Sequence, residues 1–217
     1  MGNQSVRRAM CDRIKQHVAA YQQQPLNEAV YTRMLALDRE DFGGSHADSP
    51  GPIGYGQTIS QPFMVAMMTD LLLRATDQRD VVCEIGTGSG YQAAILAHFF
   101  QQVRSIETVQ PLADAAAKRL QAMGLSHIQV IQGDGLQLPE ASFSGLIATC
   151  GVTGPIPLSW GQSLQVGGAM LLPHAPTEAD AMQIVLWRKT GSDPADLEPV
   201  QLLDHPLFCR FVPFVRG

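Results

Sequence analysis

One stretch constrains the fold of this chain more than any other: Val-Val-Cys-Glu-Ile-Gly-Thr-Gly-Ser-Gly-Tyr at residues 81–91. Its opening residues form a short apolar run rich in β-branched side chains, which predicts a buried strand. A helix is expected from about residue 89 to residue 100, because apolar side chains recur there at helical spacing. Between strand and helix, Gly86, Gly88 and Gly90 let the backbone turn sharply and approach a ligand without a Cβ in the way. The order strand, glycine-rich turn, helix therefore predicts an α/β fold with a ligand site at the turn.

The ligand predicted at this turn carries a positive charge. The glycine spacing is Gly-x-Gly-x-Gly, which differs from the Gly-x-Gly-x-x-Gly pattern of dinucleotide-binding folds. Glu84 precedes the first glycine by two residues, where a carboxylate is poorly placed beside a pyrophosphate. The same carboxylate suits S-adenosylmethionine, which carries an amino group and a sulfonium.

Two further predicted strands also end in acids. Residues 103–107 end in Glu107, about twenty residues beyond the turn, where an acid can accept both hydroxyls of a ribose. Residues 128–135 read as a third strand that ends in Asp134, which is placed to meet an adenine amino group. This order of acids favours an adenosine cofactor, and the alternative is an ordinary α/β protein with a tight turn and solvated acids. The predicted cofactor-binding residues are Glu84, Gly86, Thr87, Gly88, Ser89, Gly90, Glu107, Asp134 and Gly135.

Composition bounds the class of protein. The chain has 217 residues, 45% of them apolar, which suffices for one domain with a sizeable core. Its formal net charge of −5 argues against a large phosphate-binding face, so no nucleic-acid partner is expected. The four cysteines form no Cys-x-x-Cys pair and the six histidines show no metal-ligand spacing, so no metal site is expected. The scattered cysteines fit a reducing, cytoplasmic setting, and no signal peptide and no membrane-spanning run is recognisable, so no membrane partner is expected. We expect a monomer.

The N-terminal part is expected to contain two helices and a long loop. The helices are expected at residues 4–22 and 27–37, with Asn27 capping the second. Helical periodicity stops at residues 41–60, which are rich in glycine and proline. A loop of this length in a compact domain is usually functional or disordered, and its apolar residues favour a packed functional loop.

This loop ends at Ser60, whose local setting is that of a helix cap. A helix is expected over residues 61–73, with Pro62 in its first turn. A serine just before such a helix commonly accepts a hydrogen bond from its first turn. Local spacing therefore favours a cap over a chemical role, and both readings stay open.

Residues 52–62, Pro-Ile-Gly-Tyr-Gly-Gln-Thr-Ile-Ser-Gln-Pro, resemble the signature of the protein-L-isoaspartate O-methyltransferases. The glycine-rich motif is shared by many methyltransferases, whereas Gly-x-Gln-Thr-Ile-Ser-x-Pro is far more specific to this family. The similarity covers most of the chain and continues, in order, through residues 84–92, 133–135, 167–168, 171–173 and 210–214.

The resemblance implies a doubly wound α/β fold with a mostly parallel, seven-stranded sheet of the class I S-adenosylmethionine-dependent methyltransferase type, plus N-terminal helices. It implies a single domain, with helices and a substrate loop at 1–60 and a Rossmann-like core at 61–217. The implied reaction is methyl transfer from S-adenosylmethionine to the free carboxylate of isoaspartyl residues in damaged proteins and peptides, which initiates repair. Ser60 matches the family's serine at the methyl-transfer site and is implied to be catalytic, a role compatible with capping. The implied substrate-binding residues are Asp48, which is also an ordinary turn former, Gln57, Thr58 and Val212.

The rest of the chain contains departures from the family pattern. We expect the changes at Ser144, Gly145 and Cys150 to retune the cofactor rim without abolishing it, with Cys150 inside a strand. Together with His174, they keep open a methyltransferase acting on another carboxylate or a different substrate, and a non-catalytic S-adenosylmethionine-binding protein is the second alternative. The remaining expected elements are strands at 142–150, 169–172, 182–188 and 208–215, a helix at 157–164 and a hairpin or loop at 191–198.

Overall fold

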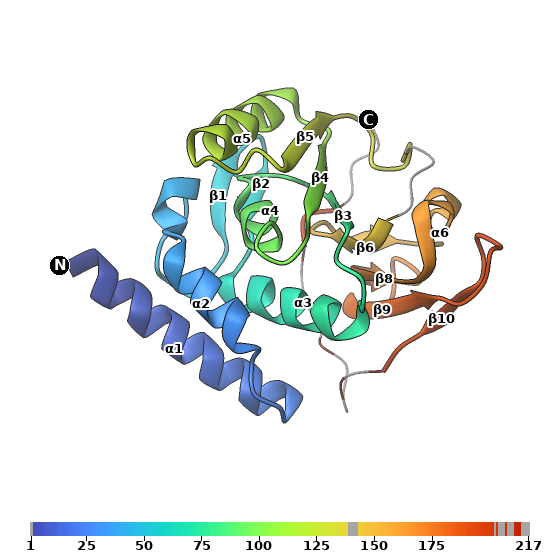
Figure 1. Cartoon of the computed structure of the whole chain (residues 1–217), viewed down its shortest axis with the longest axis horizontal. Coiled ribbons are helices and arrows are strands. Elements are labelled where there is room, and N and C mark those ends of the chain that lie inside the picture. Colours follow the sequence, from blue (N-terminus) through green and yellow to red (C-terminus); the bar gives the residue numbers. More distant parts are fainter. Residues whose placement is uncertain (1, 139–142, 202, 204–206, 208–210, 214–217) are drawn as a thin grey trace.

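A computed structural model describes residues 2–138, 143–201, 203, 207 and 211–213 of the chain (Figure 1). The helices are α1 (Gly2–Gln22), α2 (Glu28–Ala36), the 3-10 helix η1 (Arg39–Phe42), α3 (Pro62–Ala75), α4 (Tyr91–Leu96), α5 (Gln110–Ala122) and α6 (Leu158–Ser163). The strands are β1 (Gly51–Gly54), β2 (Gln57–Ile59), β3 (Val81–Ile85), β4 (Gln102–Glu107), β5 (Ile128–Gln132), β6 (Phe143–Ala148), β7 (Val152–Thr153), β8 (Leu164–Ala175), β9 (Gln183–Lys189) and β10 (Leu197–Pro199).

The central sheet has the spatial order β10-β9-β8-β6-β3-β4-β5, with the short β7 beside β8. Strands β8, β6, β3, β4 and β5 run parallel to one another, whereas β9 runs antiparallel to both β8 and β10. The chain moves outward from β3 through β4 and β5, then returns to β6 on the other side of β3. The carboxyl ends of β3 and β6 thus form a topological switch point, where open α/β sheets bind ligands. The expected doubly wound, mostly parallel sheet is confirmed.

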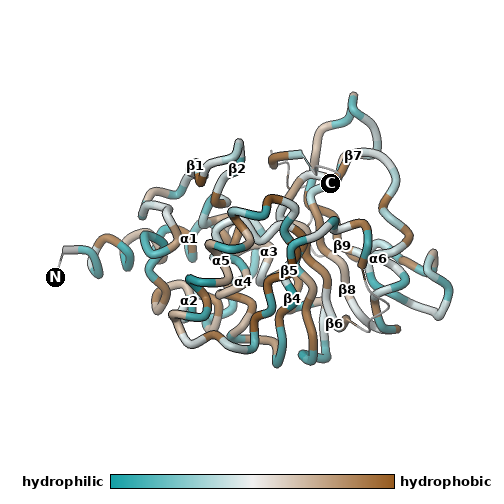
Figure 2. The backbone as a smooth tube through the Cα atoms, turned by 90° about the horizontal axis from the view of Figure 1, so that it is seen from above, coloured by the Kyte–Doolittle hydropathy of each residue, from teal (hydrophilic) through white to brown (hydrophobic). Residues whose placement is uncertain are grey.

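Both faces of this sheet are covered. Because successive side chains of a strand point to opposite faces, the residues of β8 alternate between two cores. On β8, Ala169 and Leu171 join the core shared with α1 to α4. The alternate residues Met170 and Leu172 join the core on the other face, which contains Trp160 of α6. Strands buried on both faces read as near-continuous apolar runs, as in β6, whose six residues are all buried. Brown stretches run through the strands of the sheet in Figure 2.

The N-terminal elements agree with the sequence patterns, with one addition. The side chain of Asn27 caps α2 by accepting a hydrogen bond from Ala29 N at 2.9 Å, as predicted. The predicted loop at 41–60 contains the hairpin β1–β2, which lies at the same edge of the molecule as β7 (Figure 2). Tyr55 and Gly56 form its two-residue turn, and both have positive φ. A turn of this hand matches the twist of the flanking strands, which explains how such short strands pair.

Elsewhere some boundaries differ. Helix α4 is shorter than the expected 89–100, and β8 is longer than the expected 169–172. Helix α5 had not been expected; only a narrow apolar stripe, Leu112, Ala113, Ala116 and Leu120, packs inward from an otherwise polar helix. These four residues recur at helical spacing, so the sequence did contain a signal for this helix. None of the described helices has the length and apolar character needed to cross a bilayer.

The C-terminal region is described in part. Strand β10 pairs with β9 and closes the hairpin that was one of the alternatives for residues 191–198. The expected strand at 208–215 falls largely outside the described residues. Within it, Pro213 forms an isolated parallel bridge with Gly151, and Val212 O accepts a hydrogen bond from Gly151 N at 2.8 Å.

Candidate active site

The glycine turn between β3 and α4 forms the floor of the site. Gly86, Gly88 and Gly90 have φ of 96°, 50° and 84°, a region that side chains disfavour. A Cβ at Gly86 would lie 2.6 Å from the hydroxyl of Thr149, and one at Gly88 would lie 3.3 Å from Ile53 of the β1–β2 hairpin. The turn is therefore a cradle of bare backbone at the switch point of the sheet.

Thr149 holds this turn against the end of β6. Its hydroxyl donates to the carbonyl oxygen of Gly86 at 2.5 Å, and it lies 3.1 Å from the carbonyl oxygen of Ile85. Sequence reasoning did not select Thr149. The available signal was its position near the carboxyl end of the strand expected at 142–150.

Glu84 lies at the carboxyl end of β3 and has no exposed surface. Its Oε2 accepts a hydrogen bond from the Ser105 hydroxyl, whereas its Oε1 has no hydrogen-bond partner among the described residues. Burial raises the pKa of Glu84 to about 8; the Ser105 hydrogen bond opposes this shift and the charge of Glu107 adds to it. A buried carboxyl with an unsatisfied oxygen fits a site for a cationic ligand group.

Glu107, at the end of β4, binds the glycine turn from the other side. One carboxylate oxygen accepts from Gly88 N at 2.8 Å, and the other accepts from Val109 N at 3.0 Å. Each oxygen retains a lone pair, and Glu107 lines a large cleft. The acid thus orders the turn and remains available to hydroxyl groups.

The third acid is placed differently. Asp134 follows β5, and its carboxylate accepts a hydrogen bond from Leu136 N at 2.9 Å within its own loop. Its neighbours Gly133 and Gly135 line the cleft, but Asp134 is not among the lining residues. Trp160 donates to the carbonyl oxygen of Gly135 at 2.8 Å, which fixes the backbone at this point.

A cleft of about 1340 Å³ opens above the switch point. The turn, the ends of β3 and β4, and the β1–β2 hairpin line one part of it, and the loops after β6 and β8 line the rest. Gln57, Thr58, Ser60 and Val212 all line this cleft, although the sequence separates the first three from Val212 by most of the chain.

Ser60 lies where this cleft meets a smaller cavity of about 30 Å³. The small cavity is lined by Glu84, Gly86, Thr87, Gly88 and Ser89, and Ser60 lines both spaces. The described residues provide no hydrogen-bond partner for the Ser60 hydroxyl, so it is free to act on a bound group. Gly90, by contrast, packs against Leu120 of α5 and lines neither space.

Ser60 does not cap α3, contrary to the expectation from local spacing. The N-cap position is Gln61, which makes no side-chain capping bond. The carboxylate of Asp48 accepts a hydrogen bond from Phe63 N at 2.8 Å, and the carbonyl oxygen of Asp48 accepts one from the Gln61 amide at 3.2 Å. Asp48, from an earlier part of the loop, therefore caps α3, and the Ser60 hydroxyl takes no part in capping.

A buried arginine organises the same loop. Arg39 is 1% exposed, and its guanidinium donates to the carbonyl oxygens of Ser45, Ser49 and Ser60 at 2.5, 3.0 and 3.1 Å. Arg39 therefore fixes three points along residues 45–60, including the backbone of Ser60 itself. No sequence signal marked it, because its partners are backbone groups distant along the chain.

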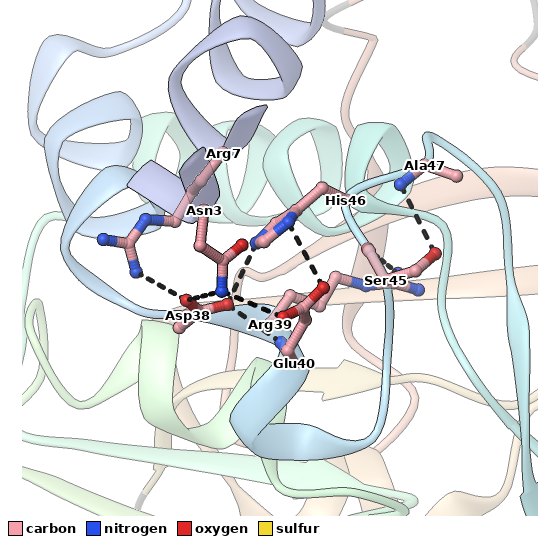
Figure 3. A network of polar contacts seen from close by, with 8 residues as sticks. All are labelled: Asn3, Arg7, Asp38, Arg39, Glu40, Ser45, His46 and Ala47. Carbon is pink, nitrogen blue, oxygen red and sulfur yellow. Dashed lines mark hydrogen bonds and ion pairs between the residues drawn. The ribbon is translucent and has the colours of Figure 1, made fainter. Parts of the chain in front are cut away.

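A polar network joins the start of the loop to α1 (Figure 3). His46 lies between two acids, with Nε2 2.9 Å from Asp38 Oδ1 and Nδ1 3.5 Å from Glu40 Oε1. Asn3 donates to both acids, and Arg7 pairs with Asp38 at 3.3 Å. Potential metal ligands of Asp38, Glu40 and His46 lie within 4.8 Å of one another, a grouping that sequence spacing did not reveal. Its polar groups bond one another, so the network serves to anchor the loop.

The departures from the family pattern fall at different places. Ser144 and Gly145 lie at the amino end of β6, where the Ser144 hydroxyl accepts from Asp80 N and Val81 N at 3.2 and 3.4 Å. They are at the opposite edge of the sheet from the glycine turn, so the expectation that they retune the cofactor rim is wrong. Cys150 does line the cleft, but it follows β6 and does not lie inside the strand.

The structure also defines the surroundings of the Cys150 thiol and of His174. Burial raises the pKa of the Cys150 thiol to about 12, so this group is neutral and weakly polar near the cleft. His174 donates from Nε2 to the carbonyl oxygen of Gly154 at 2.7 Å, joining the end of β8 to the loop after β7.

Comparison with known sequences gives one consistent result. A sequence model described as "Protein-L-isoaspartate(D-aspartate) O-methyltransferase (PCMT)" matches residues 9–216. A protein-L-isoaspartate O-methyltransferase from Pseudomonas aeruginosa is 37% identical over 187 residues, covering 85% of this chain and 83% of that protein. Protein-L-isoaspartate O-methyltransferase 2 from Syntrophobacter fumaroxidans is 47% identical over 156 residues, and the match covers 68% of this chain but only 62% of that relative.

Solved structures share the fold. A Plasmodium falciparum protein described as a protein-L-isoaspartate O-methyltransferase, in complex with S-adenosyl-L-homocysteine, superposes with a TM-score of 0.79. The superposition covers 97% of this chain and 99% of that one at 17% identity. At this identity the likeness concerns the arrangement of elements alone.

Proposed function

Because the chain belongs to the protein-L-isoaspartate(D-aspartate) O-methyltransferase family, we propose that it transfers a methyl group from S-adenosylmethionine to the free carboxylate of isoaspartyl residues in proteins and peptides. The resulting ester decomposes without the enzyme through a succinimide, which makes the transfer the first step of repair. The observation that carries the proposal is the place of Ser60 between the glycine-turn cavity and the open cleft.

The residues around the glycine turn fit S-adenosylmethionine. The unsatisfied oxygen of Glu84 suits an amino group, and the bare backbone at Gly86 and Gly88 leaves room that a Cβ would fill. Glu107 would accept ribose hydroxyls, and the backbone at Gly135 would lie by the adenine. We keep Asp134 as a cofactor-binding residue acting through this loop; Thr87, Ser89 and Gly90 shape the turn. When bound, S-adenosylmethionine supplies an electrophilic methyl group.

The acceptor requires orientation, not deprotonation. The free α-carboxylate of an isoaspartyl residue is ionised at neutral pH, so no general base is needed. Among the described residues that line the cleft, the charged side chains are Glu107 and Asp180, both acids. An acceptor carboxylate bound there by neutral donors is not tightly paired with a cation, and its oxygen therefore stays more nucleophilic. Orientation of a reacting pair contributes up to roughly 7–11 kcal/mol to lowering a barrier.

Within this scheme Ser60 donates a hydrogen bond that orients the acceptor carboxylate. Gln57 and Thr58 line the same cleft and bind the peptide. Val212, from the C-terminal part of the chain, also lines this cleft. Asp48 acts indirectly, because its carboxylate caps α3 and so fixes the segment that carries Ser60. Arg39 has the same positioning role through the Ser60 carbonyl oxygen.

Methyl transfer from labelled S-adenosylmethionine to an isoaspartyl peptide, beside the same peptide with normal aspartate, tests the function. Transfer to the isoaspartyl peptide alone is expected. Ser60→Ala should lower kcat about a hundredfold, since it removes one aimed donor, while S-adenosylmethionine still binds. Ser126→Ala, at an exposed loop position, is the matched control and should leave kcat unchanged.

Other outcomes point to other functions. If S-adenosylmethionine binds but neither peptide is methylated, the chain acts on a different carboxylate or another substrate, or binds without catalysis. The single-domain division at 1–60 and 61–217, the cytoplasmic location, the monomeric state and the lack of nucleic-acid or membrane partners stay predictions.

A further inference from the structure

Tyr55 combines an unfavourable backbone with an exposed aromatic ring. It is the first residue of the two-residue turn of the β1–β2 hairpin, with φ of 54°. Asparagine, aspartate and glycine are the residues that such turns favour, because bulky side chains disfavour positive φ. The side chain is 63% exposed, although tyrosine usually covers its ring.

The hairpin itself does not require this tyrosine. The described residues provide no hydrogen bond for its hydroxyl, and Gly54 and Gln57 pair across the turn through their backbones. Tyr55 instead lines the cleft, together with Pro50, Gln57 and Thr58, on the same wall as Ser60. Backbone strain that serves no local purpose is characteristic of functional sites.

We propose that Tyr55 is a substrate-contacting residue, whose ring packs over the peptide chain beside the isoaspartyl residue; this rests on the proposed function. Tyrosine suits that task, since it supplies a large amphipathic surface at low conformational entropy cost. The neutral ring covers backbone and apolar side-chain atoms of many different peptides, as a repair enzyme with varied substrates requires. The contact excludes water from the acceptor carboxylate held by Ser60.

The test compares Tyr55→Asn, Tyr55→Phe and the wild-type protein. Tyr55→Asn removes the ring and places a residue suited to positive φ in the turn, so the urea unfolding midpoint should equal or exceed that of the wild type. KM for the isoaspartyl peptide should rise about tenfold, since the ring buries a large apolar surface on binding. S-adenosylmethionine affinity, measured by calorimetry, should not change. Tyr55→Phe keeps the ring and should stay within about twofold of the wild-type KM.

Leu158→Asn is the matched control, because Leu158 is a similarly exposed apolar residue (67%) at the first turn of α6 that does not line the cleft. It should leave KM unchanged. A Tyr55→Asn protein with the wild-type KM overturns the proposal for Tyr55 and leaves the proposed function standing. A Tyr55→Asn protein whose S-adenosylmethionine affinity and unfolding midpoint fall along with its activity also overturns the proposal for Tyr55, because these losses indicate a structural role. A wild-type protein that methylates no isoaspartyl peptide refutes the proposed function, and the assignment of Tyr55 with it.

Discussion

Replacing Glu84 with glutamine tests the charge of the carboxyl beneath the glycine turn. Glu84 is fully buried, Ser105 is its hydrogen-bond partner, and its pKa is raised from 4.5 to about 8. As pH rises above 4.5, the unfolded chain loses this proton while the folded protein keeps it until about pH 8. The free energy of unfolding therefore falls with rising pH across this window. At 1.36 kcal/mol per pH unit, the full effect is roughly 5 kcal/mol.

Glu84→Gln keeps the shape of the side chain and removes the titration. Urea unfolding of both proteins, without S-adenosylmethionine, should show a difference in unfolding free energy that grows in favour of the variant between about pH 5 and about pH 8. Groups that do not interact with Glu84 titrate equally in the two proteins, so the change in this difference reports on Glu84 and the charge of Glu107 coupled to it. A difference that stays constant across the range would refute the reasoning, since it would mean that Glu84 is ionised in the fold.

The same pair of proteins links this charge to the cofactor. The amino group of S-adenosylmethionine requires the ionised carboxylate, so wild-type affinity should increase as pH rises toward about 8. Glu84→Gln should bind weakly, and its pH profile records only the ligand's own titration. If the affinities of the wild-type protein and Glu84→Gln for S-adenosylmethionine change with pH in the same way, Glu84 does not pair with the ligand.

Three other predictions concern the loop and the mouth of the cleft. Arg39→Met leaves three carbonyl groups without a donor, so the unfolding free energy should fall by about 3 kcal/mol or more. Limited proteolysis of this variant should cut within residues 43–60, and an unchanged cleavage pattern would contradict the role of Arg39. Asp48→Ala removes the cap of α3 and should lower the free energy of unfolding in urea by about 1 kcal/mol. Asp48→Asn keeps an acceptor and should lower it by only a few tenths of a kcal/mol; equal losses for the two variants would argue against capping. Asp180 is the acid at the mouth of the cleft, so a peptide with lysine beside the isoaspartate should be methylated more efficiently than one with glutamate. Asp180→Asn should reduce this preference about threefold at low salt, with Glu178→Gln as the control, and a preference that is insensitive to Asp180 would refute the assignment.

Several features were predictable because their signals are local. The β-branched run before the glycine turn predicts β3, and the capping side chain of Asn27 marks the start of α2 correctly. The order of strands ending in Glu84 and Glu107 places both acids at one edge of a parallel sheet, where the structure has them. Helix α5 was not predicted, although its inward-facing residues Leu112, Ala113, Ala116 and Leu120 recur at helical spacing.

The tertiary structure alone decided where each candidate site residue lies and which groups it contacts. Local spacing made Ser60 a cap, but the capping carboxylate belongs to Asp48, which the folded loop brings to α3. Ser144 and Cys150 belong to one predicted strand, 142–150, yet β6 places Ser144 at its amino end and Cys150 just beyond its carboxyl end, at opposite edges of the sheet. Arg39 and the unsatisfied oxygen of Glu84 become visible only when distant segments meet. The sequence by itself determined the family, the sheet and the glycine turn, because these rest on short-range patterns and conformational preferences. Burial, hydrogen-bond partners and the shape of the cleft depend on contacts between residues far apart in the chain, so only the folded structure could assign them.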